Sequence, residues 1–139
     1  MSSQTLEQAR ARYALERVRM RAPKDGQKPD ESTKKYATHV RSVPAMVLQS
    51  GLGQAMAFLL ADAEGDLKKP AGWLYEEIQG WLCGPQSSER PERVYASGQD
   101  LMQALVAGSR SDYQRAQEAS LALLAWMRKF ADAYLRSEE

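Results

Sequence analysis

Apolar residues recur at intervals of three and four along most of the chain, the spacing that gathers them on one face of an α-helix. No stretch alternates β-branched and polar residues between turn signals, so the pattern predicts no strand. About six to seven helical segments are expected, separated by loops that contain Pro or Gly. The prediction is an all-α fold: a single compact helical bundle over residues 1–139, with a long C-terminal helix.

The first expected helix covers about residues 6–22 and carries two apolar stripes on opposite sides. One stripe is made of Ala, Leu and Val residues, and the other includes Tyr13 and Met20. Two stripes indicate a helix packed between two layers, or between the core and a partner. Tyr13 and Met20 are therefore candidate protein-interface residues.

A second helix is expected after a loop rich in Pro and Gly, with Asp30 or Ser32 as its cap. Pro44 is expected to break or kink this helix, because proline lacks the N–H group and crowds the preceding turn. A short helix then ends at Gly51, where a positive φ is expected. The apolar stretch 54–62 leaves little polar surface, so it is expected to be the buried central helix.

Three more helices are predicted in the C-terminal half, over residues 72–83, 101–107 and about 109–135. A variant capping box that starts at Ser97 is expected to open the second of them, and Gly108 to end it. The longest helix spaces its apolar residues by four and three for about three heptads. The residues of this seam are Tyr113, Ala116, Ser120, Leu123, Met127, Phe130 and Tyr134.

Trp126 points about 100° away from the seam, on a side of the helix that is otherwise rich in alanine. Small residues there let another helix approach closely. Two interpretations remain open: Trp126 packs on another helix of its own chain, or it anchors a neighbouring subunit, since tryptophan is enriched at interface hot spots. Trp126 therefore joins Tyr13 and Met20 as a candidate protein-interface residue.

Positive charge gathers in the N-terminal third of a protein whose net charge is only +1. Residues 1–45 contain ten Lys/Arg against five Asp/Glu, whereas residues 46–107 contain four against eight. Seven-residue spacings on the first two helices align cations about 10 Å apart, which suits successive backbone phosphates. The alternative is an ordinary solvated face. The candidate nucleic-acid-binding residues are Arg10, Arg17, Arg21, Lys34, Lys35 and Arg41.

Neutralising the three arginines of the first helix is expected to weaken nucleic-acid binding without unfolding the domain, because all three are expected to project from one solvated flank.

Residues that would suit catalysis or metal binding are few and isolated. A single histidine, His39, excludes a site with several His ligands, and a single cysteine, Cys83, excludes an internal disulfide and favours a reducing compartment. The Gly51–Gly53 segment lacks the spacing of a phosphate-binding loop. No signal-peptide core or membrane-length apolar run is found. We therefore expect a cytoplasmic protein that is not an enzyme and needs no cofactor, metal or small-molecule substrate; a Cys83-dependent hydrolase is the third hypothesis.

Three segments carry a resemblance to a known family. Residues 36–44 (YATHVRSVP) place an aromatic before an apolar–Pro pair, residues 46–59 (MVLQSGLGQAMAFL) combine a Gly-Leu break with an Ala/Phe-rich helix, and residues 125–133 (AWMRKFADA) follow in order and spacing. In these features the chain resembles the small-subunit family of the type III-B CRISPR–Cas effector, the Cmr complex. The resemblance covers nearly the whole chain, but core and turn residues carry it, so it marks no site.

The resemblance implies an all-helical antiviral protein without a nuclease centre of its own. It also implies that several copies stack beside the backbone-forming subunits of the ribonucleoprotein, along the groove where guide RNA pairs with target RNA. The expected partners are the other Cmr subunits, further copies of the chain, and the guide and target RNAs. The alternative is a purely structural subunit that contacts RNA little, and the salt dependence of binding separates the two.

Overall fold

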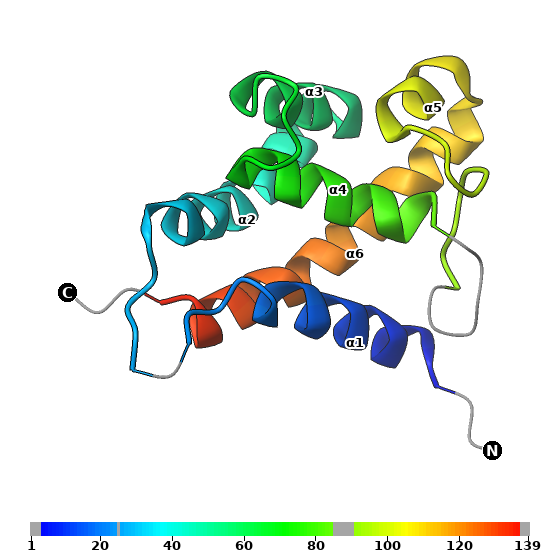
Figure 1. Ribbon diagram of the computed structural model, residues 1–139. Helices are drawn as coiled ribbons and strands as arrows, with labels where there is room; N and C mark the ends of the chain where they lie inside the picture. The colour runs from blue at the N-terminus through cyan, green and yellow to red at the C-terminus, as the bar shows by residue number, and fades with distance from the viewer. Residues whose placement is uncertain (1–3, 25, 85–90, 137–139) are drawn as a thin grey trace.

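The structure, a computed structural model, describes residues 4–24, 26–84 and 91–136. These residues form six α-helices and no strand (Figure 1), which confirms the all-α prediction. The helices are α1 (Leu6–Arg19), α2 (Glu31–Ser50), α3 (Leu52–Asp62), α4 (Pro70–Leu82), α5 (Leu101–Ala107) and α6 (Arg110–Tyr134).

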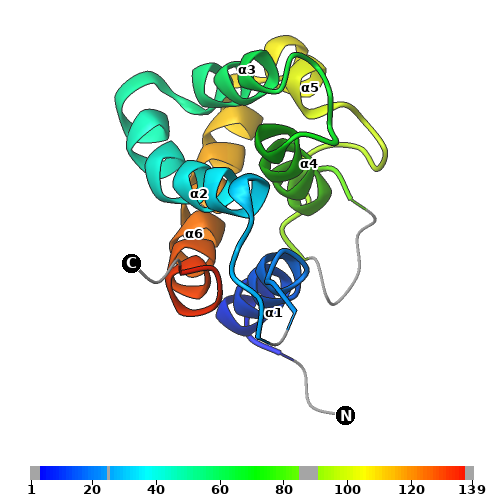
Figure 2. The same ribbon diagram turned by 60° about the vertical axis from the view of Figure 1, so that its left-hand side comes forward.

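The long helix α6 is the element around which the others are arranged. Its C-terminal half lies beside α1, and it also contacts α2, α3 and α4 (Figures 1 and 2). Helices α3 and α5 lie together at the end of the molecule away from α1. This arrangement brings the C-terminal ends of α1 and α6 and the N-terminal end of α2 to one side, at the left of Figure 1.

Side-chain caps determine where several helices begin. Asp30, rather than the alternative Ser32, caps α2, and Ser109 caps α6; each accepts a hydrogen bond from the backbone N–H three residues further on. Helix α5 has the predicted bounds, but its cap is Asp100 rather than Ser97. These starts are fixed by contacts within one turn, which is why the sequence locates them to within a few residues.

The predicted seam of α6 is buried over most of its length, but the buried arc is wider than one seam. Tyr134, at the C-terminal end, is 43% exposed. Residues outside the seam are buried as well, because several helices pack around α6. The buried residues of α6 are Ala116, Ala119, Ser120, Leu123, Leu124, Met127 and Ala131.

The predicted break at Pro44 is wrong, because α2 continues through this residue to Ser50. Proline removes one helical hydrogen bond, yet Val43 and Val47 on either side of it are fully buried. Burial of these neighbours keeps the helix continuous where local chemistry alone disfavours it.

The expectation that α3 is the buried central helix is also wrong. One face of α3 is buried, with Leu52, Met56 and Leu59 fully covered, but Phe58 is 39% exposed. The helix that supplies the largest buried side chains is α4, through Tyr75 and Trp81 among others. An apolar composition shows that a helix can be buried, but the packing of the neighbouring helices decides which of its faces are buried.

The junction between α2 and α3 is held by side chains from α6. Gly51 has φ 90° and ψ 160°, so the expected positive φ is confirmed. The amide oxygen of Gln117 accepts a hydrogen bond from the N–H of Leu52 at 2.9 Å, and the hydroxyl of Tyr113 accepts one from the N–H of Gly53 at 2.7 Å. The first N–H groups of α3 are thus satisfied from a distant part of the chain.

Candidate nucleic-acid interface

Arg10 is held within the molecule rather than projecting into solvent. Its Nε and Nη2 donate to the two carboxylate oxygens of Glu92 at 2.8 and 2.7 Å, and its Nη1 donates to Glu7 at 2.6 Å. The bonds to Glu92 are the largest cause of the raised pKa of Arg10. The expectation that Arg10 lies on a solvated flank is wrong, because the segment before α5 brings Glu92 onto α1.

Arg21, just beyond α1, is also partly buried. Its Nε and Nη2 donate to Oε2 of Glu77 on α4 at 3.3 and 3.2 Å, and only 18% of its side chain is exposed. The guanidinium lies over the ring of Trp73, with its carbon 4.4 Å from the ring centroid. Arg21 therefore pairs with a buried carboxylate, and the prediction that it lies on a solvated flank is also wrong.

The carboxylate of Glu77 is the centre of this buried cluster and is only 2% exposed. Its Oε1 accepts a hydrogen bond from the hydroxyl of Tyr36 at 2.5 Å, and its backbone carbonyl accepts one from the hydroxyl of Tyr13 at 2.5 Å. Tyr13 also packs on Trp81, with ring centroids 5.0 Å apart. Tyr13 is thus a buried bridge from α1 to α4, and the prediction that it faces a partner is wrong.

The buried role of Glu77 was not predicted from the sequence, although a signal was present. Glu77 lies three residues after Leu74 and one before Ile78, inside the apolar stripe of α4. A charged residue within such a stripe is rarely buried without a partner. Burial raises the pKa of Glu77 to about 7, although the hydrogen bond from Tyr36 and the nearby charge of Arg21 each lower it.

This pKa gives a pH dependence whose sign follows from linkage. Folded Glu77 holds its proton up to about pH 7, whereas an exposed glutamate releases it near 4.5. The stability contributed by this proton is complete below 4.5 and is lost as the pH rises through 7. Between these values the wild-type protein is expected to lose on the order of 3 kcal/mol relative to Glu77→Gln, measured by urea denaturation. If the free energy of unfolding changed with pH in the same way in both proteins, the raised pKa of Glu77 would be contradicted.

Arg17 on α1 is partly buried, whereas Met20, the residue that follows α1, is exposed. The guanidinium of Arg17 lies 5.2 Å from the ring centroid of Tyr13, and its Nε is buried without a hydrogen-bond partner in the described part of the chain. Met20 is 61% exposed, so its side chain is open to a protein partner. The interface role of Met20 stays a prediction.

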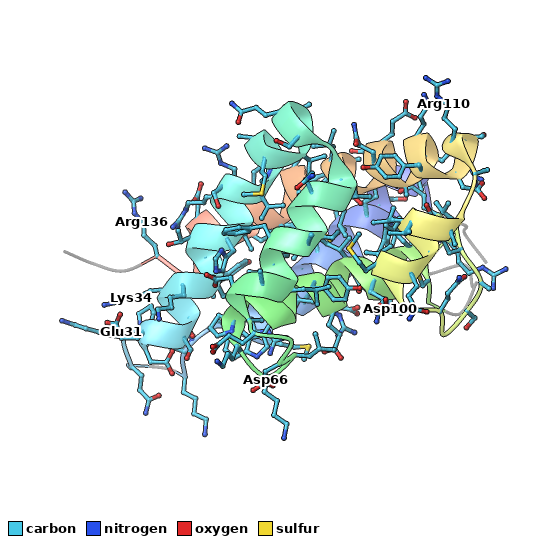
Figure 3. The ribbon with its side chains drawn as sticks, turned by 90° about the horizontal axis from the view of Figure 1, so that it is seen from above. Glu31, Lys34, Asp66, Asp100, Arg110 and Arg136 are labelled. Atoms are coloured by element: carbon cyan, nitrogen blue, oxygen red, sulfur yellow. The ribbon has the colours of Figure 1, made fainter. Side chains whose placement is uncertain are left out.

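The three cations of α2 remain at the surface. Lys34 contacts Glu31 at 3.6 Å, Lys35 is exposed, and Nε of Arg41 donates to Asp132 of α6 at 2.8 Å. Arg136 follows α6 and lines a shallow hollow with Arg41 and Asp132. Figure 3 shows Lys34 and Arg136 projecting at the same end of the molecule. We call this patch the α2–α6 basic surface; it consists of Lys34, Arg41 and Arg136, whereas Lys35 lies about 100° further around α2.

Trp126 lies partly buried where α6 meets α1. Its Nε1 donates to Glu7 at 3.2 Å, and its ring stacks on Phe130 with centroids 5.8 Å apart. The interpretation that Trp126 packs on a helix of its own chain is therefore confirmed. A role for its exposed edge in contacting a neighbouring subunit stays a prediction.

The residues considered for catalysis lie in environments that suit a structural role. Cys83 is buried, and burial raises the pKa of its thiol to about 11, which disfavours the reactive thiolate. His39 contacts Asp62, with Nε2 3.2 Å from a carboxylate oxygen. Over residues 4–24, 26–84 and 91–136, no group of three or more His, Cys, Asp or Glu is placed to hold a metal ion. The same ranges contain no helix with the length and hydropathy of a membrane span.

The fold and the site define a small all-helical protein with an internally paired charged centre and a basic surface at one end. Comparison with known proteins identifies its family. The model of the CRISPR-associated protein family Cas_Cmr5 matches residues 6–134. The chain therefore belongs to the Cmr5 family, the small subunit of the type III-B Cmr complex, and the resemblance found in the sequence is confirmed.

A solved structure supports the same assignment. The crystal structure of a CRISPR-associated Cmr5 family protein from Thermus thermophilus is similar to this one, with a TM-score of 0.70 and 25% sequence identity. The similarity covers 96% of this chain and 100% of that chain. The likeness thus extends over the whole helical domain rather than over one motif.

Proposed function

We propose that the protein is a non-catalytic subunit of the Cmr ribonucleoprotein that binds RNA through the α2–α6 basic surface. The observation that carries this proposal is the division of the cations: Arg10 and Arg21 are consumed by internal ion pairs, whereas Lys34, Lys35 and Arg136 are left at the surface. Membership of the Cmr5 family supplies the setting, in which the other subunits and guide and target RNA are the partners.

The geometry of this surface suits phosphates rather than bases. Lys34 and Arg41 are seven residues apart on α2, which separates them by about 10 Å along the helix axis. Long cationic side chains at such intervals neutralise backbone phosphates without reading sequence. Sequence is then read by base pairing between guide and target, as in RNA-guided recognition generally.

The non-catalytic part of the proposal is supported by the state of the candidate groups. Glu77 is engaged by Tyr36 and Arg21, and the thiol of Cys83 is buried with a raised pKa. Neither group is presented to a substrate. Cleavage in the complex is accordingly assigned to other subunits.

A second function, assembly through protein contacts, is favoured by exposed apolar side chains. Leu48 on α2 is 72% exposed, and Val106 on α5 is 78% exposed and lines an apolar hollow with Met102. Exposed apolar surface of this kind is what protein neighbours cover. These residues are not members of the α2–α6 basic surface, so both functions are compatible on one chain.

The RNA-binding proposal predicts the effect of removing three cations of the basic surface. Replacing Lys34, Arg41 and Arg136 with glutamine is expected to weaken target-RNA binding by the reconstituted Cmr complex. It is also expected to flatten the slope of log affinity against log salt by up to about 2, at roughly 0.7 for each single-strand phosphate that is no longer neutralised. Binding is measured over a series of salt concentrations.

A matched variant controls for net charge. Replacing Lys68, Arg110 and Arg115 with glutamine removes three exposed cations elsewhere, and Arg115 has an acidic partner three residues before it, as Lys34 does. This variant is expected to keep the wild-type affinity and salt slope. Equal effects of the two triple variants, or no effect of either, would refute phosphate binding at the α2–α6 basic surface.

A further inference from the structure

Three aromatic rings form a ladder along the C-terminal half of α6. Trp126, Phe130 and Tyr134 are spaced four residues apart, and successive ring centroids are 5.8 and 6.4 Å apart. The first two are partly buried against the core, whereas Tyr134 is 43% exposed. The ladder therefore reaches the surface at Tyr134, where α6 ends.

Arg19 of α1 lies over the exposed end of this ladder. Its guanidinium carbon is 5.5 Å from the ring centroid of Tyr134, a cation–π contact between two helices. Arg19 is itself exposed and makes no ion pair within the described residues, so its side chain is free to move from the ring. Movement of the guanidinium away from the ring would expose the ring face to a planar group.

The charges around Tyr134 favour a polyanion as the ligand. Among the described residues, the exposed acids of the adjacent turns, Glu16 and Asp132, are each paired with an arginine, whereas Arg19 and Arg136 have no acidic partner there. Tyr134 is the last residue of α6 and Arg136 follows two positions later, so the ring lies at the same end of the molecule as the α2–α6 basic surface (Figures 1 and 3). An RNA strand whose phosphates lie on that surface would pass the end of the molecule where this ring is exposed.

We propose that Tyr134 and Arg19 form a stacking site for one unpaired nucleobase of RNA whose phosphates lie on the α2–α6 basic surface. The inference rests on the proposed function and adds a base contact to it. Aromatic rings and arginine guanidinium planes are the groups on which single-stranded bases stack, and stacking tolerates any base because each has a π-face. The site is therefore indifferent to sequence but selective for an unpaired base.

The test compares two RNAs that carry the same number of phosphates. The full chain is titrated, over one series of salt concentrations, with a short oligouridine and with an abasic ribose-phosphate oligomer of equal length. The wild-type protein is expected to bind the oligouridine about tenfold more tightly, within the range of a single base–aromatic stack. Tyr134→Ala is expected to remove this preference, Tyr134→Phe to keep it, and Arg19→Gln to reduce it.

The control is Phe58→Ala, which removes an aromatic of similar exposure on α3 and is expected to keep the tenfold preference. Thermal melting of every variant checks that the domain is folded. Equal affinity of the wild-type protein for the two oligomers, with a normal salt slope, would overturn the stacking site and leave phosphate binding intact. An unchanged preference in Tyr134→Ala would overturn it too, and if that variant also fails to enter the complex, the ring contacts a protein neighbour instead.

Discussion

Replacing Arg21 with glutamine is expected to lower the free energy of unfolding by about 3 kcal/mol at pH 8. Glu77 would keep a buried carboxylate without its guanidinium, and removing one partner of a buried pair leaves an uncompensated charge. The expected loss is at the lower end of the range for such pairs, because protonation of Glu77 relieves part of it. Urea denaturation measures the change, and the loss is expected to shrink as the pH falls below 7.

The control for this prediction is Arg12→Gln on the same stretch of chain. Arg12 contacts Glu16 at 3.7 Å, and about half of its side chain is exposed, so this pair is expected to contribute less than about 1 kcal/mol. Equal stability of the Arg21 and Arg12 variants would show that Arg21 does not stabilise the interior. Because Arg21 is expected to stabilise the fold, replacing Arg10, Arg17 and Arg21 together is now expected to destabilise the domain.

Replacing Gly51 with valine is expected to cost about 3 kcal/mol of stability. The pair φ 90° and ψ 160° lies in a region that is essentially restricted to glycine, and other residues placed there cost about 1–3 kcal/mol. An added Cβ would also lie 3.0 Å from the hydroxyl of Tyr113, which accepts the hydrogen bond from Gly53. Strain and displacement of Tyr113 therefore act together, and thermal or urea denaturation measures their sum.

Gly65→Val separates these two contributions. Gly65 also has a positive φ, 74°, but a Cβ there meets nothing within 4 Å. Its substitution is expected to cost about 1 kcal/mol, the strain alone. A Gly51→Val protein that is as stable as the wild type but no longer binds RNA would contradict the structural role assigned to Gly51.

The sequence by itself determines the helices and most of their ends. Spacings of three and four predict helix in each segment that is helical in the structure, although α2 was expected to be divided at Pro44. Local caps such as Asp30 and Ser109 act within a single turn, so neighbouring residues are enough to locate them. The same holds for the positive φ at Gly51. The resemblance to the small-subunit family was also recognisable, because the core and turn residues that carry it are contiguous stretches of the chain.

Only the tertiary structure decides which helix faces are covered and which cations are free. The sequence predicts Arg10 and Lys34 alike as cations on a helix flank. In the structure Arg10 forms an ion pair with Glu92, 82 residues away, while Lys34 stays at the surface. In the same way, burial of Val43 and Val47 keeps α2 intact through Pro44. These outcomes depend on partners far apart in the chain, and the free energy of a buried charge or a broken helical bond is set by those partners rather than by local spacing.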